Sequence, residues 1–154
     1  MEMFYKQINA RGFGRPEGQG RSKVWESMSD IGALGGPSFV RVHGTEHGPA
    51  DAQCNAYCAL LANATDIKDN SGEDIVDYLA SCNVVPKDVR LDCGSVWNYL
   101  IPSFVEVREN NEYTAVTGPP DSIAICVGYE IPWEWSCLLQ IGAIDGHVDS
   151  IYSE

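Results

Sequence analysis

The sequence feature that most constrains the fold is a β-hairpin signal near the C-terminal end. Two mostly apolar runs, over 136–144 and 147–152, are separated by Asp145-Gly146 alone. A two-residue Asp-Gly connection favours a type I′ turn, whose twist matches that of two paired strands. The pattern therefore predicts an antiparallel sheet at this end of the chain, in which the continuous apolar run over 123–127 is typical of a central strand.

Helical patterns precede this sheet. Residues 48–63 form the clearest one, because Pro49 suits a first turn and Ala and Leu fill the body. Ser71 is the expected N-cap of a second helix that ends before Pro86. Residues 87–100 fit a third helix, with apolar side chains on one face.

The first third of the chain is rich in glycine. An alternating pattern over 38–43 predicts a short strand, and the remaining residues before 49 are expected to form loops. The fold class that follows is α+β, with a Gly-rich N-terminal arm and loops, two to three helices, and a C-terminal antiparallel sheet that ends in the hairpin.

The net charge of −12 is divided unevenly. Residues 1–23 hold five basic and two acidic side chains, so they carry +3, whereas residues 24–154 hold five basic and 20 acidic side chains and carry −15. We therefore divide the chain into a basic arm, 1–23, and one acidic α+β domain, 24–154. Such a body repels nucleic acid and anionic membranes and attracts cationic partners.

This charge pattern favours a non-enzymatic protein-binding domain. One version is a subunit of a homo- or hetero-oligomeric assembly, structural or virion-type, whose basic arm contacts acidic neighbours. The other is an acidic inhibitor or immunity-type protein that covers a basic partner. Because two Trp side chains two residues apart in an extended segment face the same side, they join the arm among the expected partner-binding residues: Arg11, Phe13, Arg15, Arg21, Trp133 and Trp135.

The N-terminal residues lack the apolar stretch of a signal peptide, and no apolar run is long enough to span a membrane. A cytoplasmic location is therefore expected, and most of the six cysteines are expected to be buried thiols rather than disulfides. No cofactor is expected, because phosphate-loop and dinucleotide fingerprints are missing from the sequence.

An enzymatic alternative begins at Cys54, near the start of the helix over 48–63, where the helix dipole lowers a thiol pKa. A helix-borne Cys, then Gly-Pro-Pro-Asp before an apolar strand, then Gly146-His147-Val148 resembles the NlpC/P60 and CHAP families of papain-like cysteine hydrolases. The resemblance implies Cys54 as nucleophile, His147 as general base, and Asp121 or Asp149 as the residue that orients the base.

A metal site is a further hypothesis for the same stretch. Two histidines and two cysteines supply ligand types that zinc prefers, in the spacing His43-x3-His47-x6-Cys54-x3-Cys58. Whether these four side chains meet in space depends on how the loop around His47 folds, which sequence spacing alone does not determine. The alternative is that the two histidines are ordinary polar loop residues and the two cysteines are thiols of the core.

Overall fold

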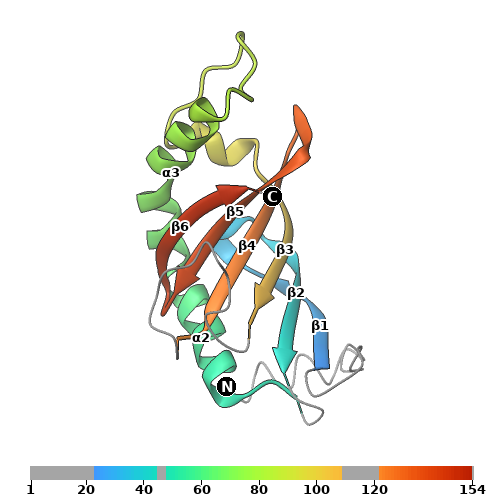
Figure 1. Cartoon of the computed structure of the whole chain (residues 1–154). Helices are drawn as coiled ribbons and strands as arrows, with labels where there is room; N and C mark the ends of the chain where they lie inside the picture. The colour runs from blue at the N-terminus through green and yellow to red at the C-terminus, as the bar shows by residue number, and fades with distance from the viewer. Residues whose placement is uncertain (1–22, 45–47, 109–121, 154) are drawn as a thin grey trace.

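The computed structural model of the chain describes residues 23–44, 48–108 and 122–153, and it leaves out the side chains of residues 23 and 135–137. Six strands form one sheet in the order β1-β2-β3-β4-β5-β6 (Figure 1). The strands are β1 Lys23–Asp30, β2 Pro37–Gly44, β3 Ile101–Val107, β4 Ala124–Ile131, β5 Glu134–Ile144 and β6 His147–Ser153. Neighbouring strands are antiparallel except for β2 and β3, which are parallel.

Two α-helices, α2 (Asp51–Ala62) and α3 (Ala64–Ser81), follow β2 in the chain and lie along one side of the sheet (Figure 1). Two short 3₁₀ helices, η1 (Gly32–Leu34) and η2 (Ser95–Asn98), complete the described elements. The fold class is thus α+β, as predicted, although the sheet is mixed. No helix in the described part of the chain is both long and apolar enough to cross a membrane.

The C-terminal hairpin is confirmed. Asp145 and Gly146 join β5 to β6 with φ of 51° and 78°, the two positive values that a type I′ turn requires. The predicted central strand is confirmed as well, because β4 pairs with β3 on one side and β5 on the other and is buried along almost its whole length. The predicted helix over 48–63 is α2, and the strand predicted over 38–43 is β2.

The prediction of loops before β2 is wrong over 23–30. These residues form β1, which pairs with β2 along its full length. The strand forms because Trp25 and Ser27 lie opposite Val42 and Val40 and point into the core with them. The parallel pair β2–β3 was also missed; it joins the N-terminal hairpin to the C-terminal strands, so the sheet is not purely antiparallel.

The predicted N-cap role of Ser71 is wrong. Helix α3 begins at Ala64, directly after Asn63, and Ser71 is buried in its middle. The Ser71 hydroxyl donates a hydrogen bond to the carbonyl of Ile67 one turn earlier, a bond that is compatible with a continuing helix. Residues 64–81 therefore form one helix, and its acidic side chains are exposed.

The third helix predicted over 87–100 is wrong except for the single turn of η2. The Asp92 carboxylate accepts hydrogen bonds from the backbone N–H groups of Gly94 (3.0 Å) and Ser95 (2.7 Å). These side-chain bonds hold a turn where helical bonds would otherwise form, and they lower the pKa of Asp92, with the bond from Ser95 as the largest cause.

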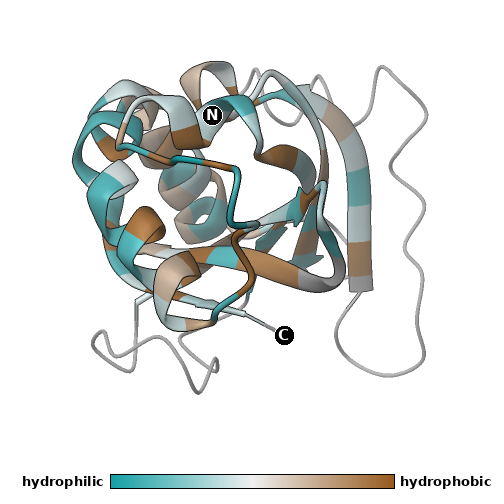
Figure 2. Ribbon diagram, turned by 90° about the horizontal axis from the view of Figure 1, so that it is seen from above, coloured by the Kyte–Doolittle hydropathy of each residue, from teal (hydrophilic) through white to brown (hydrophobic). Residues whose placement is uncertain are grey.

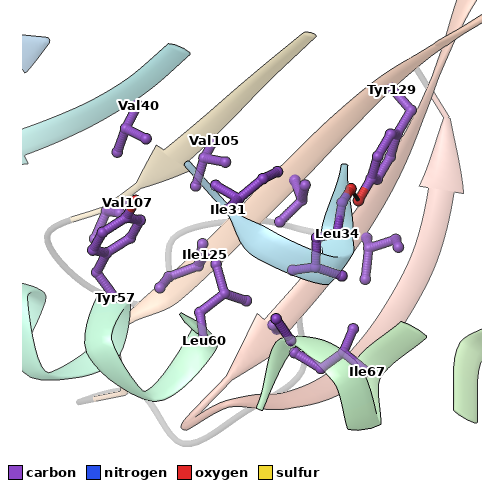
Figure 3. Packing of buried hydrophobic residues seen from close by; sticks show 14 of the residues in the cluster. Ile31, Leu34, Val40, Tyr57, Leu60, Ile67, Val105, Val107, Ile125 and Tyr129 are labelled. Carbon is purple, nitrogen blue, oxygen red and sulfur yellow. Dashed lines mark hydrogen bonds between the residues drawn. The ribbon is translucent and has the colours of Figure 1, made fainter. Parts of the chain in front are cut away.

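The hydrophobic core fills the space between the sheet and the helices. Figure 3 shows Val40, Val105 and Ile125 of the sheet pointing toward Tyr57 and Leu60 of α2. Hydrophobic and hydrophilic residues are interspersed along both the strands and the helices (Figure 2), as expected of elements that bury one side. The Tyr57 hydroxyl also donates to Ser29 Oγ of β1 at 2.7 Å, so α2 is fixed to the N-terminal edge of the sheet.

Candidate functional site

The start of α2 is held by Gln53, a residue that is 2% exposed. Its Oε1 accepts the backbone N–H of Ala50 at 2.8 Å, which satisfies a free donor at the helix start. Its Nε2 donates to the carbonyl of His43 at 2.6 Å and to the carbonyl of Arg108 at 3.0 Å. One side chain therefore joins α2 to the ends of both parallel strands, β2 and β3.

Cys54 follows Gln53 and is fully buried in the core. His147 lies elsewhere: Gly146 before it rests on the last turns of α2, where a Cβ at this glycine would lie 2.8 Å from the Ala59 carbonyl oxygen. Ala59 and Asn63 lie five and nine residues after Cys54, which corresponds to roughly 8 and 14 Å along the helix axis. No described hydrogen bond joins Cys54 to His147, and Asp121 lies outside the described residues. The hydrolase therefore stays a prediction from sequence.

The cysteines are more exposed than the sequence predicts. Of the five described, only Cys54 and Cys126 are buried, and no disulfide joins any two of the five. Cys58, Cys82 and Cys93 are exposed. Cys58 lies on the outward side of α2, Cys82 directly follows α3, and Cys93 lies shortly before η2. The prediction of mostly buried thiols is thus wrong for these three. Apolar neighbours in the sequence do not determine whether a cysteine side chain faces the core or the solvent.

His43, a predicted metal ligand, is paired with a carboxylate on β3. Its Nε2 lies 2.6 Å from Glu106 Oε1, and Arg108 Nη2 lies 3.4 Å from the other oxygen of the same carboxylate. His47 lies outside the described residues. Among the residues that are described, no three His, Cys, Asp or Glu side chains gather closely enough to hold a metal ion. The four-ligand site therefore has no support from its described members.

An acidic groove lies between α3 and β6. It has a volume of about 470 Å³ and is lined on one side by Asp66, Asn70 and Asp74 of α3. His147 and Asp149 line the other side. The three α3 residues are spaced four apart, so they fall on one stripe of the helix. None of the lining residues in the described chain is a lysine or arginine.

The groove is held open between two elements that are fixed to each other. The Tyr78 hydroxyl of α3 lies 2.6 Å from Ser153 Oγ at the end of β6. At the other end, the β5–β6 turn packs on α2 through Gly146. A larger residue at this position would clash with the Asn63 side chain. The groove thus combines a rigid frame with exposed carboxylates, and such a surface attracts cationic groups.

Sequence reasoning gave the domain its net acidic charge but did not single out a groove. The four-residue spacing of Asp66, Asn70 and Asp74 indicates from sequence alone that they lie on one face of α3. Asp149 joins them only through the packing of β6 against α3, which no local pattern encodes.

The predicted partner-binding residues are only partly described. Arg11, Phe13, Arg15 and Arg21 lie outside the described residues, and so does the side chain of Trp135. Trp133 follows β4 in the turn before β5, and its ring meets that of Tyr99 edge to face with centroids 4.9 Å apart. It is half-buried and packs against the margin of the core.

No protein-family model, curated protein or solved structure is found to match this chain.

Proposed function

We propose that this chain is a non-enzymatic protein-binding domain that serves as a subunit of an assembly. The acidic groove between α3 and β6 binds a basic, extended segment of protein. The observation that carries the proposal is the lining of the groove, in which Asp66, Asp74 and Asp149 occur without a described lysine or arginine. Its volume of about 470 Å³ lies in the range of ligand-binding clefts, about 300–1,000 Å³.

The arm of a neighbouring copy has the chemistry that this groove requires. Residues 1–23 carry +3, and Arg11, Arg15 and Arg21 lie in a glycine-rich stretch that also contains Phe13. A guanidinium can bind a carboxylate through two parallel hydrogen bonds. Each exposed pair contributes only about 0.2–1 kcal/mol, so several pairs must form together, and the attraction must weaken as salt is added.

An acidic inhibitor or immunity-type protein is the second version of the same proposal. In that case the groove receives a basic segment of a different protein. The arm favours the assembly, because an inhibitor does not itself require five basic side chains beside an acidic body. Both versions use the same groove, and they differ in whether the chain alone forms a multimer.

Light scattering on the full chain at low and high salt tests the proposal. The double variant Asp66→Asn/Asp74→Asn removes two groove carboxylates while retaining similar side-chain shapes. The matched control is Asp69→Asn/Asp77→Asn, which makes the same charge change at exposed α3 positions outside the groove lining.

We expect the wild type and the control to form a multimer that dissociates at high salt, and we expect the groove variant to dissociate already at low salt. If the groove variant and the control assemble equally, the groove is not the binding site. A wild-type chain that is monomeric under both conditions contradicts the assembly version and leaves the inhibitor version.

A further inference from the structure

The acidic side of the groove between α3 and β6 has a regular spacing. Asp66, Asn70 and Asp74 are exposed and follow one another at four-residue intervals. Because each helical residue rises by about 1.5 Å, the two carboxylates lie roughly 12 Å apart along the helix axis. Neither carboxylate has an ion-pair partner in the described part of the chain. Lys68, the one basic residue of α3, lies instead over Trp97, with its Nζ 6.0 Å from the ring centroid.

The floor of the groove is apolar. Ile67 of α3 lines it together with Val148 and Ile151 of β6. Val148 pairs with Ala143 of β5, and Ile151 pairs with Ile141. Because both β5 partners are buried in the core, the two β6 side chains point to the same face of the sheet, toward α3. They are three positions apart, and a register shift in the β5–β6 pair allows both to face the helix.

One stretch of the N-terminal arm has a matching spacing. Residues 11–15 read Arg-Gly-Phe-Gly-Arg, so the three large side chains occupy every second position. In an extended segment these side chains lie on one side, and the two arginines are roughly 13 Å apart. This separation is close to that of Asp66 and Asp74, and Phe13 falls between the two charges. No other two lysines or arginines in the sequence are four positions apart.

The two glycines suit the other side of such a segment. When the large side chains point toward α3 and the floor, Gly12 and Gly14 point toward β6. A glycine has no side chain, so the backbone of the segment can lie close to the strand. Residues 147–151 of β6 line the groove, and an extended segment of five residues has the same length as this part of the strand.

We infer that the groove recognises residues 11–15 of a second copy of this chain, bound in an extended conformation. The two guanidinium groups bind Asp66 and Asp74, and the ring of Phe13 lies on the apolar floor. The inference rests on the function proposed above. It adds which five residues of the arm bind, and it makes the alternation of Arg, Phe and Arg, rather than charge alone, the basis of recognition.

The distance from β1 to the groove favours a second copy as the source of the segment. The arm leads into β1, which lies at the opposite edge of the sheet from β6 (Figure 1). Five strand spacings of about 4.8 Å separate these edges by roughly 24 Å. The eight residues from Arg15 to Lys23 span at most roughly 29 Å when fully extended. That length leaves almost nothing for a route around the strands and helices that lie between, whereas the arm of a neighbouring copy has no such limit.

The test is light scattering of the full chain at low salt, across a concentration series. The variant Phe13→Gly/Gly14→Phe exchanges two neighbours, so the ring moves to the opposite side of the extended segment while composition and charge stay the same. Gly18→Gln/Gln19→Gly is the matched control, because it is an exchange of neighbours outside residues 11–15. We expect the control to associate like the wild type, and we expect the dissociation constant of the Phe13 exchange to be at least about tenfold higher.

A second exchange, Gly14→Arg/Arg15→Gly, moves one guanidinium to the opposite side of the segment. It keeps the net charge, and we expect it to weaken association by a similar factor. All these changes lie before β1, so urea unfolding should give the same midpoint for each variant as for the wild type.

The outcomes separate this inference from the function on which it rests. If both exchange variants associate as tightly as the control while Asp66→Asn/Asp74→Asn dissociates, the groove binds basic charge without reading the alternation, and the inference is wrong. If the groove variant associates like the wild type, the proposed function fails and the inference fails with it. A wild-type chain that is monomeric at low salt overturns a second copy as the source of the segment.

Discussion

Replacement of Gln53 by alanine is the sharpest test of how α2 is attached to the sheet. The change removes three hydrogen bonds: the one from the Ala50 N–H, and those to the carbonyls of His43 and Arg108. Each such bond stabilises a folded protein by about 1 kcal/mol net, and a buried group left without a partner costs about 1–3 kcal/mol. Because Gln53 is 2% exposed, water cannot easily replace the bonds, and we expect a loss of about 3 kcal/mol.

Urea unfolding followed by circular dichroism measures this loss. With a slope of about 1–3 kcal/mol per molar urea, the midpoint of Gln53→Ala should fall by about 1–3 M. Asn55→Ala is the control, because Asn55 is an exposed residue of the same helix and its change should stay within about 0.5 kcal/mol. A loss below about 1 kcal/mol for Gln53→Ala would refute the argument that this one side chain joins α2 to both parallel strands.

Three further predictions concern the core and the thiols. Gly72→Ala should destabilise the protein by about 1–3 kcal/mol despite the better helix propensity of alanine, because the new Cβ would lie 2.2 Å from the Cys93 carbonyl oxygen. The midpoint of urea unfolding measures this loss, and an unchanged midpoint would contradict the prediction. Burial raises the pKa of Tyr57 and of Tyr129, so the folded state retains protons that the unfolded state releases above about pH 10. Stability should therefore be intact below about pH 10 and should fall at higher pH, by up to about 1.4 kcal/mol per pH unit for each tyrosine; the Tyr129→Phe variant should show a shallower fall. A thiol reagent at neutral pH should react quickly with the exposed cysteines and slowly with the buried Cys54 and Cys126. Fast, selective reaction of Cys54 would instead favour the hydrolase.

The elements that were predicted correctly have local causes. Asp145-Gly146 is enough to determine a type I′ hairpin, because both residues accept positive φ. Helix α2 follows from Pro49 and a body of Ala and Leu. The Ser71 N-cap failed because a serine hydroxyl can also bond to a carbonyl inside a helix, and sequence does not distinguish the two.

The features that were missed depend on contacts far apart in the chain. Strand β1 has no strong apolar alternation, and it forms because β2 supplies its hydrogen-bond partners and the core side chains opposite it. The parallel register of β2 and β3 places Arg41 opposite Glu106 and brings His43 within reach of the same carboxylate, although 63 residues separate His43 from Glu106. The acidic groove also needs β6 beside α3, so its third carboxylate could not be predicted from the period of the helix.

The most direct test of the proposed function is to add the arm in trans. A fluorescently labelled peptide with the sequence of residues 1–22, the arm without Lys23 of β1, is titrated with the full-length protein, and its anisotropy is recorded at low and high salt. A second peptide, in which Arg11, Arg15 and Arg21 are replaced by glutamine, is the control for charge.

The account predicts that the native peptide binds, that salt weakens the binding, and that Asp66→Asn/Asp74→Asn weakens it far more than Asp69→Asn/Asp77→Asn does. Equal binding by both double variants, or by both peptides, would contradict the claim that the groove between α3 and β6 recognises the basic arm.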